Sequence, residues 1–144
     1  PAEHGLVGYR IDMGGRVMQM LKWGDEKGDL RNMYSPDLVQ PCPSFMGASV
    51  PVLSKAELEG SAFTQAHLRG VRPKGWRAAS SIAVEIGELL RSGEKFIYAY
   101  YDGVDKIAHE RGFGAFYEAE LRSADALVAN IIEILVFVDF YQIK

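Results

Sequence analysis

The 144 residues are enough for one ordinary domain with a single hydrophobic core. Hydrophobic residues make up 48% of the chain and charged residues 24%, which excludes an intrinsically disordered chain. The formal net charge is −3 and the basic residues are scattered, so we expect no nucleic-acid partner.

Cys42 is the single cysteine, which excludes an intramolecular disulfide and a cysteine-pair zinc motif. This favours a reducing compartment, and we expect a cytoplasmic protein. Residues 1–10 lack the basic start and apolar core of a signal peptide, and no run of 18 uncharged apolar residues occurs, so no membrane association is expected. Because the chain starts at Pro1 within what resembles a loop, we expect a fragment of a longer protein.

In the first half of the chain the expected elements are short. Residues 16–23 alternate after Gly14 and Gly15, which favours a strand. Prolines limit the segment 42–48 to a short helix, and residues 49–53 are expected to form a short strand. The stretches "SKAELEG" (54–60) and "TQAHLRG" (64–70) fit short helices or turns, each with a leading hydroxyl residue as N-cap and a closing glycine. The basic stretch 69–77 could touch an anionic ligand, but a solvated loop is favoured.

The second half carries stronger patterns. Residues 78–92 have apolar side chains at helical spacing and a stop at Gly93, so an amphipathic helix is predicted. "KFIYAYY" (95–101) predicts a buried, parallel strand. A second long helix is predicted from 115 to about 136, with an apolar stripe at 117, 121, 124, 128, 131 and 135. This order predicts an α/β fold, in which helices cover both faces of a mostly parallel sheet.

One pair of residues suggests a metal site. The segment 102–112 leaves the predicted strand at its carboxyl end, where open α/β sheets place their ligands. Asp105 and His109 are four residues apart, so a carboxylate oxygen and an imidazole nitrogen can converge on one cation such as zinc.

Judged from the residue types alone, a structural role for Asp105 and His109 is favoured over a metal site. Zinc normally needs at least three protein ligands, and the other histidines, His4 and His67, are remote in sequence. Asp105 could instead cap a helix or pair with His109. The charged residues around them, Asp102, Lys106, Glu110 and Arg111, could form ordinary surface pairs worth about 0–1 kcal/mol each.

Three segments resemble a known family. "FIYAYYDGVDKIAHERG", followed by "AELRSADALVANI", resembles the Asp-x-x-x-His segment of the type I phosphodiesterase/nucleotide pyrophosphatase family in the alkaline phosphatase superfamily. "PAEHGLVGYRI" is similar to the family's Pro-x-x-His-Gly loop, and "EGSAFTQAHLRG" resembles a stretch between the two. The segments occur in the expected order and cover most of the chain.

The resemblance implies a function and a ligand pair. The fold would be part of an alkaline-phosphatase-like α/β/α sandwich, with residues 1–144 as a single partial domain and 131–144 as a divergent tail. Asp105 and His109 would bind one zinc ion of a two-metal centre that cleaves small phosphodiester or nucleotide substrates through a Thr or Ser phosphoryl-enzyme. His4 would shape its loop through a buried hydrogen bond.

The resemblance also implies what this chain lacks. The nucleophile and several metal ligands would lie outside residues 1–144, so the chain alone is expected to be inactive, and its substrate-binding residues are unknown. Thr64 is interpreted as a cap or turn hydroxyl and not as the nucleophile. Asp139 precedes Phe140 and not the family's His-Gly, so it is not assigned as a ligand.

Two alternatives stay open. The first is a sister enzyme that hydrolyses phosphomonoesters, phosphonates or sulfate esters with the same metal centre. The second is a non-catalytic binding or interaction module, or a relic, in which Asp105 and His109 are structural. A partial sheet also predicts exposed strand edges and therefore self-association.

Overall fold

The computed structural model describes residues 8–142, and side chains within 8–137. His4 and Asp139 lie outside the residues or side chains so described, and the expectations for them stay untested. The chain divides into two compact units. Within the described residues, the first unit takes in 8–50 and 57–72, and the second takes in 51–56 and 73–142.

The first unit contains a small antiparallel sheet. Its strands follow one another in the order β1 (Arg10–Asp12), β2 (Val17–Gln19), β3 (Gly24–Asp25) and β4 (Gly28–Asp29). Gly14 and Gly15 both have positive φ angles, of 69° and 88°, which glycine adopts without steric cost in the turn between β1 and β2. Short helical segments follow: α1 (Pro36–Val39), η1 (Ser44–Gly47), η2 (Ala56–Leu58) and α2 (Ala62–His67).

The core of this unit lies beneath one face of the sheet. It is built from the buried side chains of Met18, Met20, Trp23, Leu30, Val39, Ala62 and Ala66. The strand predicted at 16–23 is confirmed only for Val17–Gln19, because the chain turns after it and Trp23 adopts a φ of 52°. The indole Nε1 of Trp23 donates a hydrogen bond to the carbonyl oxygen of Tyr34 at 2.7 Å, which satisfies its one polar atom.

The predicted N-caps of the short helices are wrong. Ser54 lies buried in a strand, and the N-cap of α2 is Ser61, whose side chain accepts a hydrogen bond from the backbone N–H of Thr64 at 3.0 Å. Thr64 lies inside α2, and its hydroxyl oxygen accepts a hydrogen bond from Ser61 Oγ at 2.9 Å. Thr64 is therefore not itself the cap: it lies in the first turn of α2, and its backbone N–H and its hydroxyl both bond to the cap residue Ser61.

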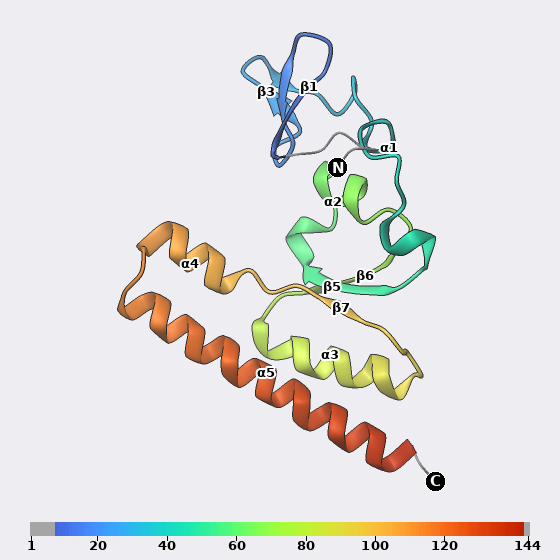
Figure 1. The fold of residues 1–144 in the computed structure, drawn as a ribbon, viewed down its shortest axis with the longest axis vertical. Helices are drawn as coiled ribbons and strands as arrows, with labels where there is room; N and C mark the ends of the chain where they lie inside the picture. Colours follow the sequence, from blue (N-terminus) through green and yellow to red (C-terminus); the bar gives the residue numbers. More distant parts are fainter. Residues whose placement is uncertain (1–7, 143–144) are drawn as a thin grey trace. The chain divides into compact units, whose positions relative to one another are not determined.

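The second unit combines a three-stranded parallel sheet with three helices (Figure 1). The strand order is β6 (Arg72–Trp76), β5 (Pro51–Lys55) and β7 (Tyr98–Ala99), and β5 pairs in parallel with β7 through Val52↔Tyr98 and Leu53↔Ala99. The helices are α3 (Ala79–Arg91), α4 (Gly103–Arg111) and α5 (Ala115–Gln142). In Figure 1, α3 lies between this sheet and α5.

Both long helices confirm the sequence analysis. The core joins Leu53 of β5 and Trp76 of β6 to Ile82, Ile86 and Leu89 of α3, and Leu127 and Ile131 of α5 pack against it. The predicted stripe on α5 is partly wrong, because Leu121, Val128 and Leu135 are 41–54% exposed. The half-buried positions are 117, 120, 124, 127, 131 and 134, so three members of the predicted stripe are kept and the other three move by one residue.

Two other predictions are corrected. The strand at 95–101 has only the two residues of β7, and both are exposed, because β7 lies at the edge of the sheet and β5 is its one neighbouring strand among residues 8–142. The stretch 69–77 is not only a loop, since residues 72–76 form β6, although all of β6 except Trp76 is exposed.

The structure is therefore a mixed α/β fold, with helices, a small antiparallel sheet and a three-stranded parallel sheet. Among the helices of the described residues, none is both long enough and apolar enough to cross a membrane.

Candidate functional site

The carboxyl ends of the three parallel strands carry polar and aromatic side chains. Lys55 is the last residue of β5, Trp76 is the last of β6, and Tyr101 and Asp102 lie two and three residues after the end of β7. In open α/β sheets, ligands bind beyond this edge. The predicted position of the site therefore holds charged and aromatic side chains that can contact a ligand.

An ion pair joins the end of β5 to the N-cap residue of α4. Lys55 Nζ lies 2.8 Å from Asp102 Oδ2, and the two side chains are only 18% and 19% exposed. Lys55 Nζ also lies 5.7 Å from the centroid of the Trp76 ring, within the range of a cation–π contact. The second carboxylate oxygen, Asp102 Oδ1, is buried and has no hydrogen-bond partner among the described residues.

A second polar contact fixes the start of α4 to α5. The hydroxyl of Tyr101 donates a hydrogen bond to Glu120 Oε1, and this bond, with burial and the nearby carboxylates, raises the pKa of Tyr101 to about 12. A Cβ atom at Gly103 would collide with both the Tyr101 hydroxyl and the Glu120 carboxylate. Any larger residue at 103 would therefore displace the ends of these two side chains from their present positions.

Asp105 and His109 lie together on α4, as predicted. His109 Nδ1 is 3.4 Å from Asp105 Oδ1 and 2.9 Å from the Asp105 carbonyl oxygen. Their side chains are 74% and 78% exposed, so both are accessible to a ligand from solvent. An Nδ1–H bonded to a carbonyl leaves Nε2 as the basic nitrogen, which is the arrangement commonly found at metal-binding histidines.

Two of the structural alternatives for this segment, a helix cap by Asp105 and a surface ion pair of Asp102, are wrong. Asp105 does not cap α4, because the N-cap position is taken by Asp102, whose side chain makes no capping hydrogen bond. Asp102 does not form an ordinary surface pair, since its partner is the half-buried Lys55. Within 8–137, no group of three or more His, Cys, Asp or Glu side chains could hold a metal ion. The described residues thus offer two ligands and not a complete zinc site.

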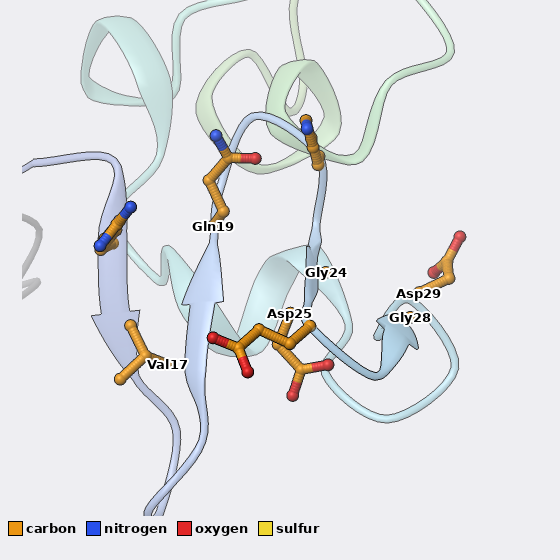
Figure 2. A pocket seen from close by; sticks show the side chains of 9 residues that line it. Val17, Gln19, Gly24, Asp25, Gly28 and Asp29 are labelled. Carbon is orange, nitrogen blue, oxygen red and sulfur yellow. The ribbon is translucent and has the colours of Figure 1, made fainter.

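The first unit contains a pocket that the sequence did not predict. A cavity of about 550 Å³ lies over the antiparallel sheet, and Figure 2 shows Val17, Gln19, Gly24, Asp25, Gly28 and Asp29 around it. Arg10, Lys22 and Glu26 complete the lining. The alternation of residues along β1 and β2 could have indicated a face open to solvent. It does not show which strands pair, and the pocket depends on that pairing.

Two of the pocket carboxylates are already paired. Burial opposes ionisation of Asp25, but hydrogen bonds from the Arg16 guanidinium and from backbone N–H groups hold the pKa of Asp25 below its usual value. Arg16 Nε lies 2.7 Å from Asp25 Oδ2. Hydrogen bonds from the side chain and backbone of Arg31 likewise lower the pKa of Asp29. Both carboxylates are therefore ionised at neutral pH and neutralised by arginine.

Comparison with known proteins gives no match: neither a protein-family model, nor a curated protein, nor a solved structure corresponds to this chain.

Proposed function

We propose that the chain is part of a zinc-dependent phosphodiesterase or nucleotide pyrophosphatase, in which Asp105 and His109 hold one of two metal ions. The fold of the whole protein would be an alkaline-phosphatase-like α/β/α sandwich. As the resemblance implies, the proposal assigns the nucleophile and the remaining ligands to sequence outside the 144 residues. The substrate would be a small phosphodiester or nucleotide.

The observation that carries the proposal is the position of the pair. Asp105 and His109 stand on the first helix after β7, and β7 runs parallel to β5, so the pair follows the carboxyl edge of a parallel sheet. Side chains at this edge are the usual ligand-binding groups of such sheets. Both side chains are open to solvent, which a site that receives further ligands requires.

The chemistry of the pair supports zinc over a harder cation. A carboxylate oxygen and a neutral imidazole nitrogen are both common zinc ligands. The Nδ1 atom of His109 is the ring nitrogen nearest to Asp105, so binding of one ion by Asp105 and His109 Nε2 together requires the imidazole ring to rotate. When bound, a two-metal centre supplies charge stabilisation to both ends of an in-line displacement at phosphorus.

A second candidate function is a non-catalytic interaction module. The 3.4 Å separation of His109 Nδ1 and Asp105 Oδ1 is also what an ordinary (i, i+4) ion pair on an exposed helix produces. In that case the pair contributes about 0–1 kcal/mol to stability and has no ligand. A sister enzyme acting on phosphomonoesters, phosphonates or sulfate esters would use the same metal ligands, so zinc binding does not separate it from the main proposal.

A zinc titration observed through the histidine ring signals in NMR separates the two candidates. We expect the His109 signals to shift or broaden at lower zinc concentration than those of His4 and His67. His109→Ala and Asp105→Asn should both abolish this preferred site. Binding should be weak, because two ligands fall short of the three or more that zinc normally has.

Glu110→Gln is the matched control, because Glu110 is an exposed carboxylate on the same helix and is not assigned as a ligand. It should leave the titration unchanged. Equal broadening of all three histidines, or binding that persists in His109→Ala, would exclude the metal-ligand role and leave the interaction module.

A further inference from the structure

A row of four residues crosses the outer face of the antiparallel sheet in the first unit. Arg10 pairs with Gln19, Gln19 pairs with Gly24, and Gly24 pairs with Asp29. Residues directly opposite one another on neighbouring strands have their side chains on the same face. Because Met18, the neighbour of Gln19 on β2, points into the core, this row faces away from it.

The row contains a gap at Gly24. A Cβ atom there would lie 2.7 Å from the carbonyl oxygen of Gly28, so the close approach of β3 and β4 requires glycine. In Figure 2, Gln19 and Asp29 lie on either side of Gly24. Because Gly24 has no side chain, the cavity lies over the middle of the row, and the polar side chains of the row stand at its margins.

Gln19 carries an unsatisfied acceptor. Its Oε1 atom is buried and has no hydrogen-bond partner among the described residues. Leaving a buried polar atom unpaired costs about 1–3 kcal/mol, and such atoms in native structures call for an explanation. The atom has no accessible surface in the present rotamer, so rotation of the Gln19 amide toward the pocket is what would bring it to a hydroxyl or N–H donor of a ligand.

The unpaired charges in the pocket are mainly positive. Asp25 and Asp29 are neutralised by Arg16 and Arg31. No hydrogen bond or ion pair joins the side chains of Arg10 and Lys22 to other described residues, and both line the cavity. Together with Glu26, which also lines the cavity, Arg10 and Lys22 leave a net unpaired charge of one positive, which favours an anionic ligand such as a phosphate monoester.

The remaining lining favours hydroxyl groups on the ligand. Glu26 lines the cavity with an exposed carboxylate that accepts hydrogen bonds only. The cavity of about 550 Å³ falls within the range of about 300–1,000 Å³ that is usual for small-molecule sites. A phosphate group alone would leave both the Gln19 acceptor and most of this volume unused.

We infer that the pocket over β1–β4 binds a small phosphorylated polyol, with the size and chemistry of a sugar phosphate. Arg10 and Lys22 bind the phosphate group, and Gln19 Oε1 accepts a hydrogen bond from a ligand hydroxyl. This site is separate from the Asp105/His109 pair and does not depend on the proposed function.

The test is a ligand titration of the full chain, followed by the backbone amide signals in NMR. Ribose 5-phosphate, glucose 6-phosphate and glycerol 3-phosphate are compared with inorganic phosphate, ribose and glucose. At least one sugar or polyol phosphate should bind about tenfold more tightly than inorganic phosphate and than the uncharged sugars, and should shift the amides of Gln19 and Gly24. No such preference, or shifts elsewhere only, would overturn the inference.

Variants distinguish the two contacts. The double variant Arg10→Gln/Lys22→Gln and the single variant Gln19→Leu should each weaken the best ligand about tenfold or more. Lys27→Gln is the matched control, because Lys27 is an exposed cation in the β3–β4 turn that does not line the cavity, and it should bind normally. Amide signals of the buried Met18 and Trp23 report whether each variant is folded. Normal binding by the folded double variant would contradict the assigned site.

Discussion

Lys55 and Asp102 are 47 positions apart in the sequence and form a half-buried ion pair, with Nζ 2.8 Å from Oδ2. The pair joins the end of β5 to the residue that begins α4. It therefore fixes the helix that carries Asp105 and His109 to the carboxyl edge of the parallel sheet.

We expect Lys55→Met to lower the free energy of unfolding by about 2 kcal/mol, because it leaves the Asp102 carboxylate poorly solvated and unpaired. Urea denaturation followed by circular dichroism measures this. Lys74→Met is the matched control, since the Lys74–Glu85 pair is 3.8 Å long and its side chains are 50% and 36% exposed. That change should cost about 0–1 kcal/mol. Equal costs for the two variants would show that the Lys55 pair has no special role.

The Tyr101–Glu120 hydrogen bond predicts a pH effect in the alkaline range. The folded pKa of Tyr101, about 12, is above its ordinary value of 10.0, so the bond stabilises the protein fully below pH 10. This contribution is lost as the pH rises through 12. The ring signals of Tyr101 in NMR should accordingly titrate with a pKa of about 12 and not at the ordinary value of 10.0.

Glu120→Gln should move the pKa of Tyr101 back toward its ordinary value, because it removes the carboxylate that disfavours the phenolate. Glu118→Gln, at an exposed position of the same helix, should leave the titration of Tyr101 unchanged. An unaltered Tyr101 titration in Glu120→Gln would mean that the bond does not form in solution.

The edge position of β7 predicts self-association. Its residue Tyr98 is 40% exposed, and the neighbouring Phe96 is 54% exposed. An edge strand presents backbone groups to which a second chain can add, and a charge placed on the edge opposes this. In sedimentation equilibrium the mass should rise with protein concentration, and Tyr98→Lys should suppress the rise.

Val84→Lys places the same charge on an exposed position of α3 and serves as the comparison. It should leave association unchanged. A monomer at every concentration, or equal effects of the two lysines, would rule out association through β7.

The patterns that extend over many residues predicted the fold best. Helix α3 was predicted within one residue at each end, because its apolar spacing spans several turns and Gly93, with a φ of 95°, ends it. The strand at β7 was overestimated, because aromatic residues usually indicate burial but here lie at a sheet edge. The shift of the buried face on α5 has a similar cause, since Leu121 and Leu127 are equally apolar and only packing decides between them.

The site was predictable only where its residues are close in sequence. The Asp105/His109 spacing places both side chains on one helix face, and the structure agrees. The partner of Asp102 is not on its own helix but on a strand far away in the chain, so no local pattern contains it. The pocket over β1–β4 depends on strand register, which brings Arg10 and Asp29 into one row although neither neighbours the other in sequence.

The chain passes from one compact unit to the other three times, near residues 50, 56 and 72. The connection between β5 and β6 is accordingly made from residues of the first unit. No single proteolytic cut can release either unit intact, and no simple truncation can express one without a part of the other. Isolating a unit would require joining its two segments through a new linker.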